Sequence, residues 1–332
     1  MVTLASNNMT IEDAVRSMDA QGNMLPTAEL LNQRNGIIPD IRWREGNLVG
    51  GHSYSQRTQL PSIFTVLPGQ GTPESASSKA QMIEAPEILG GWSIIDENVA
   101  NYGGDPAAKL ASEDVSFIEQ FDETVAKRWF YGNPAAAPGQ MLGLAPRYGS
   151  ISGNSGGTAQ MIVDGGGTGS INMSCWLLGW SPKALYGWYP MGTPGGLYKR
   201  SWAPEPRTNA DGTTQVIYRT QFQWSIGQAL EDPRFVSRLC NVDRATLTAG
   251  TGPDLFTKMI QQIRVIFDIN ACAPSFYCNR TYRMMLDIQA RNDVLAGGQL
   301  KYDVVDGKRI EFFQDIPLSY VDQLTLTEPR VV

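Results

Sequence analysis

The sequence predicts an α+β fold, in which helices and strands are mixed without regular strand–helix–strand alternation. Three segments carry this prediction: an amphipathic helix from about Ser112 to Phe130, an alternating strand at 214–226 and an apolar run at 171–180. The chain has 332 residues, 42% of them hydrophobic and 18% charged, so it can bury a core in one large domain or two lobes.

The helix at 112–130 has the expected features at both of its ends. Ser112 can cap its start, acidic residues occupy the first turn, and Lys127 and Arg128 lie in the last turn before Gly132. The apolar residues recur at helical spacing and form one stripe, made of Val115, Ile118, Phe121, Val125 and Trp129.

Other helices are predicted on both sides of this one. Thr10 can cap one short helix, and Pro26 suits the first position of a second. A helix from about Asp254 to Asp268 has an apolar side made of Phe256, Met259, Ile260, Ile263 and Phe267. A last helix is predicted from Thr281 to Asp293.

Strand patterns dominate much of the second half of the chain. The short, almost continuously apolar run at 171–180 is typical of a strand buried on both faces. Residues 214–226 alternate, apart from Ile217, and the turn at 209–214 predicts a hairpin tip. One face has Val216, Tyr218, Phe222, Trp224 and Ile226, and the other has Gln215, Arg219, Gln221, Gln223 and Ser225. The closing segment 308–328 is strand-like around Pro317.

Residues 46–82 predict a long two-stranded ribbon, with a Pro/Gly cluster at 68–74 between two extended runs. Only Arg57, Glu74 and Lys79 are charged in this segment, and its apolar residues are too sparse for a core of their own. A two-stranded ribbon is marginally stable alone in water, so it must lie on its own body or on a neighbouring chain. The sparse charge and open strand edges favour contact with protein.

The sequence gives little support to a nucleotide-binding loop, a catalytic triad or a metal site. The glycine-rich stretch at 165–170 has Ser170 where a dinucleotide fingerprint needs glycine, lacks a Walker lysine and precedes a strand. It is interpreted as a turn whose glycines serve backbone shape. His52, the only histidine, lies beside Gly50 and Gly51 in the ribbon and is predicted to be solvated or at an interface. The sequence predicts no catalytic, cofactor-binding or metal-binding residue.

One enzyme alternative stays open, a carbohydrate-active enzyme with paired carboxylates and tryptophan platforms. Its candidate acids are Asp96, Glu97, Glu231, Asp232 and Asp315, and the chain has eight tryptophans. Against it, several tryptophans fall on apolar helix or strand faces, where core packing is the ordinary role.

Compartment and partner classes follow from composition. No secretory signal or membrane-length apolar run is visible, and four cysteines without a CxxC pair predict reduced, buried thiols in a cytoplasm. The net charge of −6 argues against broad electrostatic binding of nucleic acid, although not against a protein that surrounds it.

A series of short motifs resembles a known family over nearly the whole chain and in the same order. The motifs are Glu45-Gly46-Asn47, Arg57-Thr58 with Leu60-Pro61, Phe130-Tyr131-Gly132-Asn133, residues 143–148, the 165–170 turn, Asn279-Arg280-Thr281 with residues 286–289, and residues 316–324. The chain is similar to major capsid proteins of short-tailed double-stranded DNA bacteriophages with the Hong Kong 97-type fold.

The resemblance implies names for the segments. Residues 1–45 would be an N-terminal arm and 46–98 an extended loop over an adjacent subunit. Residues 99–145 would be a peripheral domain with a long spine helix, 146–298 an axial domain, and 299–332 the return strand of the peripheral domain.

The resemblance also implies a function and partners. The chain would be a non-enzymatic subunit that assembles as hexamers and pentamers into an icosahedral shell, made in the host bacterial cytoplasm and found in the virion capsid. The shell would enclose double-stranded DNA without reading its sequence, and no cofactor or membrane is involved. A separate scaffolding protein and a portal protein are expected, assembly is expected to be noncovalent, and a cement or decoration protein is allowed.

Two sets of assembly residues are predicted. Candidate intersubunit contacts are Arg57, Leu60, Ile63, Phe64 and Lys79. Arg57 is the preferred polar anchor, with a solvated strand charge as its alternative role. Candidate hinges, which would let one chain fit different shell positions, are Gly46, Gly50, Gly51, Pro68, Gly69, Gly71 and Gly132.

Overall fold

The computed structural model describes residues 35–69, 71–102, 105–152, 157–209, 212–292, 300–305 and 308–332. The two helices predicted near Thr10 and Pro26, and most of the predicted arm at 1–45, lie outside these residues. The described chain divides into two compact units, the first made of residues 88–125 and 194–225 and the second of the remainder. No helix in the described ranges is long and apolar enough to cross a membrane.

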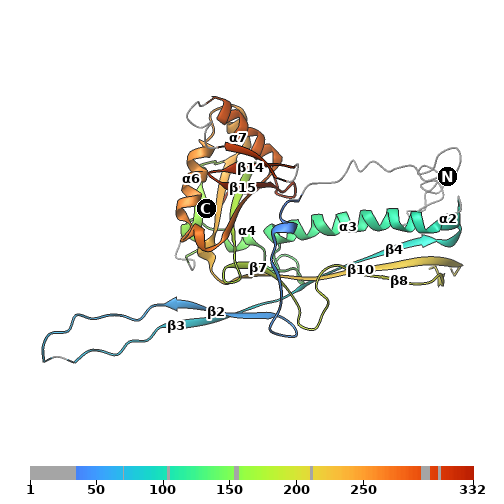
Figure 1. Cartoon of the computed structure of the whole chain (residues 1–332), viewed down its shortest axis with the longest axis horizontal. Helices are drawn as coiled ribbons and strands as arrows, with labels where there is room; N and C mark the ends of the chain where they lie inside the picture. The colour runs from blue at the N-terminus through green and yellow to red at the C-terminus, as the bar shows by residue number, and fades with distance from the viewer. Residues whose placement is uncertain are drawn as a thin grey trace. The chain divides into compact units, whose positions relative to one another are not determined.

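The first unit is a small sheet with two helices (Figure 1). Its elements are β4 (Glu87–Asp96), α2 (Glu97–Asn101), α3 (Pro106–Tyr131), β8 (Tyr198–Ser201), β9 (Glu205–Thr208) and β10 (Thr214–Leu230). β10 pairs with β4 and is antiparallel to β8 and β9. The ends of α3, β4 and β10 contribute residues to the second unit.

Helix α3 begins earlier than predicted. Pro106 occupies its first position and Asp105 Oδ1 accepts a hydrogen bond from Ala108 N at 3.0 Å, so Asp105 and not Ser112 caps the helix. The predicted stripe is correct from Phe121 onward and wrong before it, because Val115 and Ile118 are 45% and 41% exposed.

Phe117 takes the place of Val115 and Ile118 on the buried side of α3. Its ring stacks on Phe222 of β10 with 5.3 Å between ring centroids, and Phe121 lies 6.4 Å from the same ring. The helix therefore covers the sheet with phenylalanines spaced four residues apart, which lie on one helical face.

The alternation of β10 is confirmed from Thr220 to Ile226 and fails at its start. Ile217 is buried and Val216 is exposed, the reverse of the prediction. Residues 214–217 pair with β9 and residues 220–223 pair with β8, so the inward face changes between the two pairings.

The second unit is built around a mixed sheet. The strands of the unit are β1 (Trp43–Glu45), β2 (His52–Gln59), β3 (Ser78–Glu84), β5 (Ile162–Asp164), β6 (Asn172–Trp180), β7 (Leu185–Tyr189), β11 (Val236–Asp243), β12 (Ala273–Cys278), β13 (Leu300–Val305), β14 (Lys308–Phe313) and β15 (Ile316–Tyr320). Of these, β2 and β3 form a separate two-stranded sheet. Its helices are η1 (Ile38–Asp40), α4 (Leu144–Arg147), η2 (Ala159–Met161), η3 (Pro233–Phe235), α5 (Arg244–Thr248), α6 (Leu255–Val265), η4 (Ile269–Ala271) and α7 (Arg280–Asn292).

Strand β6 is the centre of this sheet. It is antiparallel to β11 and β12, touches β7 at Trp180, and is buried at every residue, which confirms the predicted buried strand. β12 continues the sheet to β15 in parallel, and β13–β14–β15 form its antiparallel end, with Pro317 inside β15.

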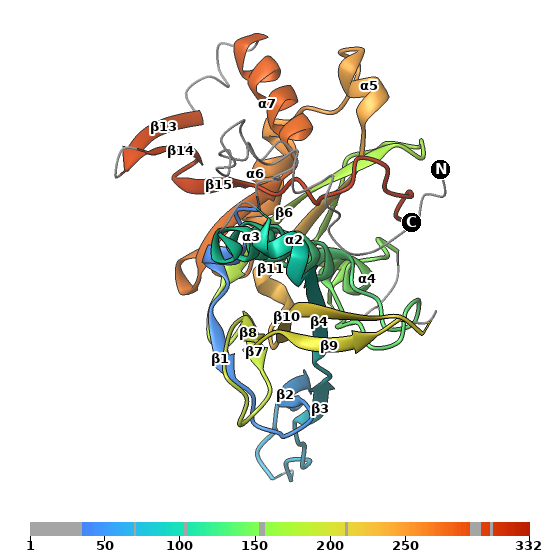
Figure 2. The same ribbon diagram turned by 90° about the vertical axis from the view of Figure 1, so that its right-hand side faces the viewer.

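Helices α6 and α7 close the core of the second unit (Figure 2). Phe256 and Met259 of α6 and Leu286 of α7 belong to the same buried cluster as Leu177 and Phe276 of the sheet. One residue of the predicted α6 stripe is wrong, because the helix ends at Val265 and leaves Phe267 67% exposed. All four cysteines are free thiols, and three of them are buried.

Phe276→Ala should lower the free energy of unfolding of the unassembled subunit by about 3–5 kcal/mol, because it empties a fully buried site. Phe267→Ala is the matched control. Its expected loss of unfolding free energy is below about 1 kcal/mol, because the ring is largely exposed and the contact that it loses is the one with the Arg234 guanidinium. Urea unfolding measures both variants. Equal losses would contradict the assigned core.

Candidate assembly surface

The predicted ribbon is present as a separate two-stranded sheet (Figure 1). β2 and β3 are antiparallel, with His52 opposite Glu84 at one end and Gln59 opposite Ser78 at the other. Beyond the strands, residues 60–77 have no regular secondary structure where they are described. The ribbon therefore has a paired stem and a long extended loop.

The outer part of the ribbon is bare. Every described residue from 57 to 79 is exposed, including the five predicted contact residues. Its large apolar side chains are exposed by 69% at Leu60, 95% at Ile63, 44% at Phe64, 42% at Val66 and 61% at Leu67. Apolar surface gathered in this way is typical of interaction sites, since a soluble monomer rarely leaves it uncovered.

Arg57 and Lys79 lie directly opposite each other on β2 and β3. Like charges in this position repel, and neither side chain has an ion-pair partner within the described residues. A β-bulge follows Arg57, so the ladder is irregular at this point. An external carboxylate would relieve the repulsion between two cations at such opposed strand positions.

The inner end of the ribbon belongs to a largely buried polar cluster, which we call the ribbon base. Its residues are Arg44, His52, Tyr54, Gln56, Glu84, Arg147, Tyr186 and Glu231. His52 is 3% exposed, which corrects the expectation of a solvated histidine. Its Nε2 lies 2.8 Å from Tyr186 Oη and 3.0 Å from Arg44 Nη2, and its Nδ1 lies 3.4 Å from Asn47 N. Tyr186 and Arg44 both donate to Glu231, at 2.5 Å and 3.0 Å.

A second group of polar contacts secures the same end. Tyr54 donates to Glu84 across the ribbon at 2.8 Å, and Arg147 forms an ion pair with Glu84 at 2.8 Å. Gln56 donates to the carbonyls of Leu230 and Glu231 at 3.1 Å and 2.8 Å. Burial, and then the Glu84 carboxylate, raise the pKa of Tyr54, which therefore stays protonated. The ribbon base thus ties β2 and β3 to the body of the unit.

The predicted hinge positions have different surroundings. Gly50 and Gly71 have open space around them, and Gly69 has φ of +90°, a conformation that favours glycine. Gly51 and Gly132 are tightly packed, because an added Cβ would come within 2.9 Å of Glu84 O and 2.4 Å of Met141 O respectively. Gly46 is also packed, against Trp188. Pro68 lies in the exposed loop.

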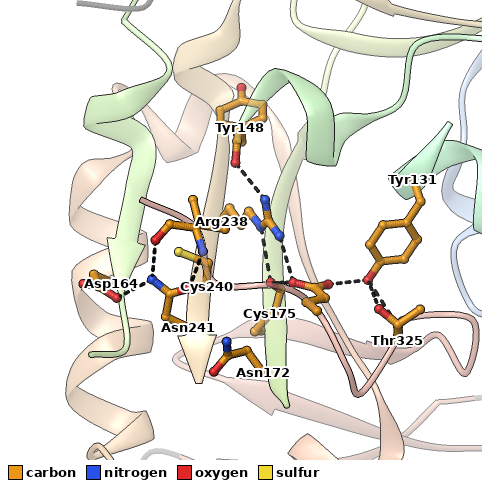
Figure 3. Close-up of polar contacts among 12 residues, drawn as sticks. Tyr131, Tyr148, Asp164, Asn172, Cys175, Arg238, Cys240, Asn241 and Thr325 are labelled. Atoms are coloured by element: carbon orange, nitrogen blue, oxygen red, sulfur yellow. Dashed lines mark hydrogen bonds and ion pairs between the residues drawn. The ribbon is translucent and has the colours of Figure 1, made fainter. Parts of the chain in front are cut away.

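The glycine turn at 165–170 serves backbone shape, as predicted. Gly165 N and Gly167 N donate to the carbonyls of Cys240 and Asn241, each at 2.8 Å. An added Cβ on Gly167 would lie 2.5 Å from Asn241 O, so only glycine permits this close approach. Asn241 in turn holds Asp164 through its Nδ2 at 2.9 Å (Figure 3).

A buried ion pair secures the C-terminal segment, and sequence reasoning missed it. Arg238 of β11 and Glu328 lie 2.8 Å apart with their side chains 5% and 3% exposed. Arg238 also donates to Tyr148 O at 2.8 Å, and Tyr131 donates to Glu328 (Figure 3). The side chain of Asn241 pairs with the backbone of Val331, at 2.8 Å and 2.9 Å. Partners some 90 residues apart leave no local sequence signal.

Four of the five carboxylates of the enzyme alternative have structural partners. Asp96 caps α2, Asp232 caps η3, and Glu231 belongs to the ribbon base. Asp315 pairs with Lys301 at 2.7 Å. Each of these four acids therefore has a structural role within its own unit.

Most of the tryptophans offered as sugar platforms lie in the core. The buried ones are Trp129, Trp176, Trp180, Trp188 and Trp224. Trp92 and Trp202 stack on each other with 5.4 Å between ring centroids, and Arg219 lies over Trp92. The described residues also contain no group of three or more histidine, cysteine or acidic side chains placed to hold a metal.

Comparison with known proteins points to one family. The family model described as major capsid protein GP7 matches residues 19–332. A structure of bacteriophage Epsilon15 has a TM-score of 0.80 at 24% identity, covering 100% of this chain and 99% of that one. The capsid of bacteriophage JBD30 has a TM-score of 0.51 at 9% identity, covering 90% and 93%. No curated protein matches. The two structures confirm the predicted fold.

The ribbon base should weaken on acidification. Burial and Arg44 lower the pKa of His52 below its ordinary value of 6.5, so the neutral ring is the stable form and its contribution is lost as the pH falls below that value. Wild type should therefore lose more thermal stability than His52→Gln between about pH 7.5 and about pH 5.5. Identical pH profiles for the two subunits would contradict this role.

Proposed function

The chain belongs to the major capsid protein GP7 family and is a shell-forming capsid protein with the Hong Kong 97-type fold, and from this premise we propose how its surfaces hold the shell together. The proposal is that the ribbon of one copy lies over a neighbouring copy. The single observation that carries it is the contrast between a buried, hydrogen-bonded ribbon base and a wholly exposed apolar loop.

Chemistry divides the proposed contact into two parts. Leu60, Ile63 and Phe64 supply apolar area, which gives most of the favourable free energy of association. Arg57 and Lys79 would fix the position of the ribbon on its neighbour, because a carboxylate of the neighbour between them would relieve their mutual repulsion. Many such contacts around a closed shell act together, so each can be modest.

The parts of the subunit keep their predicted boundaries in this proposal: arm 1–45, extended loop 46–98, peripheral domain 99–145, axial domain 146–298 and return strand 299–332. Hexamers and pentamers of the chain form an icosahedral shell. Gly50, Gly69 and Gly71, with Pro68, adjust the ribbon to different neighbours, whereas Gly46, Gly51 and Gly132 have packing roles.

We also propose that the chain is not an enzyme and that its partners are those of a phage shell. Assembly takes place in the host cytoplasm with a separate scaffolding protein and a portal protein, with room for a cement protein, and the product is the virion capsid. Its net charge of −6 suits a wall around double-stranded DNA that does not bind it tightly. Turnover of a sugar or nucleotide by a stable monomer would favour the enzyme alternative instead.

Deletion of residues 68–74 should give folded subunits that assemble poorly, because it removes the loop tip without touching the ribbon base. Arg57→Ala should weaken assembly less, and Arg264→Ala, which removes an exposed cation from α6, should leave it unchanged. Circular dichroism checks the fold and electron microscopy counts closed shells. Unfolding of the deleted subunit, or normal shells from it, would refute the ribbon proposal.

The chain expressed alone should form aberrant or poorly closed particles, and a scaffolding protein should restore uniform shells. One chain that fits several shell positions does not itself select a single curvature. Electron microscopy of particles made with and without the scaffold tests this expectation. Uniform closed shells from the chain alone would show that no separate scaffold is needed.

A further inference from the structure

Strand β4 has an open edge without the usual protection. It pairs with β10 and with no other strand in the described part of the chain. Its residues 88–95, Ile-Leu-Gly-Gly-Trp-Ser-Ile-Ile, contain neither charge nor proline. The acids at its two ends are already engaged, since Glu87 binds Arg128 and Asp96 caps α2. An uncharged open edge of this length invites pairing with another strand.

Three other outer strands of the protein carry charges or a proline, as edge strands ordinarily do. β8 reads Tyr-Lys-Arg-Ser, β9 contains Pro206 between charged residues, and β13 carries Lys301 and Asp303. Charges and prolines on edges prevent unwanted strand addition. Their absence from β4 therefore indicates an edge that another strand covers in the assembled protein.

The two faces of β4 differ in a way that suits such a strand. Gly91 faces α3, where an added Cβ would lie 3.3 Å from the Phe117 ring. Ile88 and Trp92, on the opposite face, are 62% and 43% exposed. Gly90 lies between them, and an added Cβ there would meet only Phe222 O at 4.0 Å. This face thus exposes much of Ile88 and part of Trp92, whose ring also stacks on Trp202, with open space at Gly90 between them.

The ribbon loop contains a segment with matching chemistry. Residues 62–67, Ser-Ile-Phe-Thr-Val-Leu, are uncharged and rich in β-branched and aromatic residues. They are exposed and belong to no strand of their own chain. Six extended residues span about 20 Å, enough to pair with most of residues 88–95. Segments of this composition readily add to open edges.

We propose that residues 62–67 of one copy add a strand to the open edge of β4 in a neighbouring copy. The inference rests on the proposed function, in which the ribbon lies over a neighbour, and names the receiving element. Backbone hydrogen bonds depend little on side-chain fit, so the pairing would tolerate the slightly different positions of neighbouring copies in a shell. Apolar side chains of the loop would cover Ile88 and the exposed part of Trp92. A second copy is the expected occupant because the shell is made of copies of this chain.

Hydrogen exchange on the full chain tests this pairing directly. In wild-type shells, compared with unassembled subunits, alternate amides of residues 88–95 and of 62–67 should exchange at least about tenfold more slowly. The remaining amides of 88–95 already face β10 and should change little. Protection of 88–95 without protection of 62–67 would show that another strand fills the edge, and would refute the proposed occupant.

A charge placed on the edge provides the matched variant. Gly90→Lys should fold, because the position is open, but should lose the protection gained on assembly and form at least about tenfold fewer shells. Gly90→Ala, which adds only a Cβ, should behave as wild type. Normal shells and normal protection in Gly90→Lys would overturn the inference. If the 68–74 deletion blocks assembly while residues 88–95 gain no protection, ribbon docking stands and strand addition fails.

Discussion

Strand β6 is the element on which the second unit depends, because it is hydrogen-bonded along both edges and buried on both faces. The side chain of Trp176 shows how many other elements contact this strand. The Trp176 ring lies 5.7 Å from Phe130 near the end of α3 and 6.0 Å from Tyr148 after α4, and Arg238 lies 5.0 Å from its centroid. A strand with so many neighbours tolerates few changes, since a change of volume would be felt on every side.

Buried polar groups follow a common rule in both units. A charge in the interior is tolerated only where several hydrogen bonds replace water. Lys109, which is 1% exposed, donates to the carbonyls of Val99 and Ala100 at 2.9 Å and 3.2 Å and so satisfies the end of α2. Burial lowers the pKa of Lys109, while these carbonyls hold the ammonium. Arg238 meets the same requirement with Glu328, Ser174 and Tyr148.

Local patterns predicted the elements well where one periodicity governs the segment. β6, α6 and α7, and the ribbon are where the sequence indicated, because each is defined by spacing within a few residues. The start of α3 was misplaced, because Ser112 and Asp105 are both capable caps and the structure uses Asp105, with Pro106 in the first helical position. The composition of the loop left open whether it lies on its own body or on a neighbouring chain, and in the structure it does not pack on its own body.

The ribbon base shows the limit of such reasoning. His52 and Tyr186 are 134 residues apart, and a histidine among glycines and serines gives no sign of a distant phenol. The same holds for Arg238 and Glu328, whose pairing needs β11 and the C-terminal segment side by side. Contacts of this kind depend on topology, which propensity and periodicity do not encode.

The opposed cations of the ribbon have a consequence for the time before assembly. Bare apolar loops at high subunit concentration would stick to one another, and charged residues beside an aggregation-prone segment act as gatekeepers against this. Arg57 and Lys79 stand where the paired stem gives way to the loop, so two unassembled ribbons that approach in register bring four positive charges together. Like-charge repulsion at this point would disfavour contact between two free ribbons and would favour a partner that supplies an acid, although salt weakens such repulsion at exposed positions.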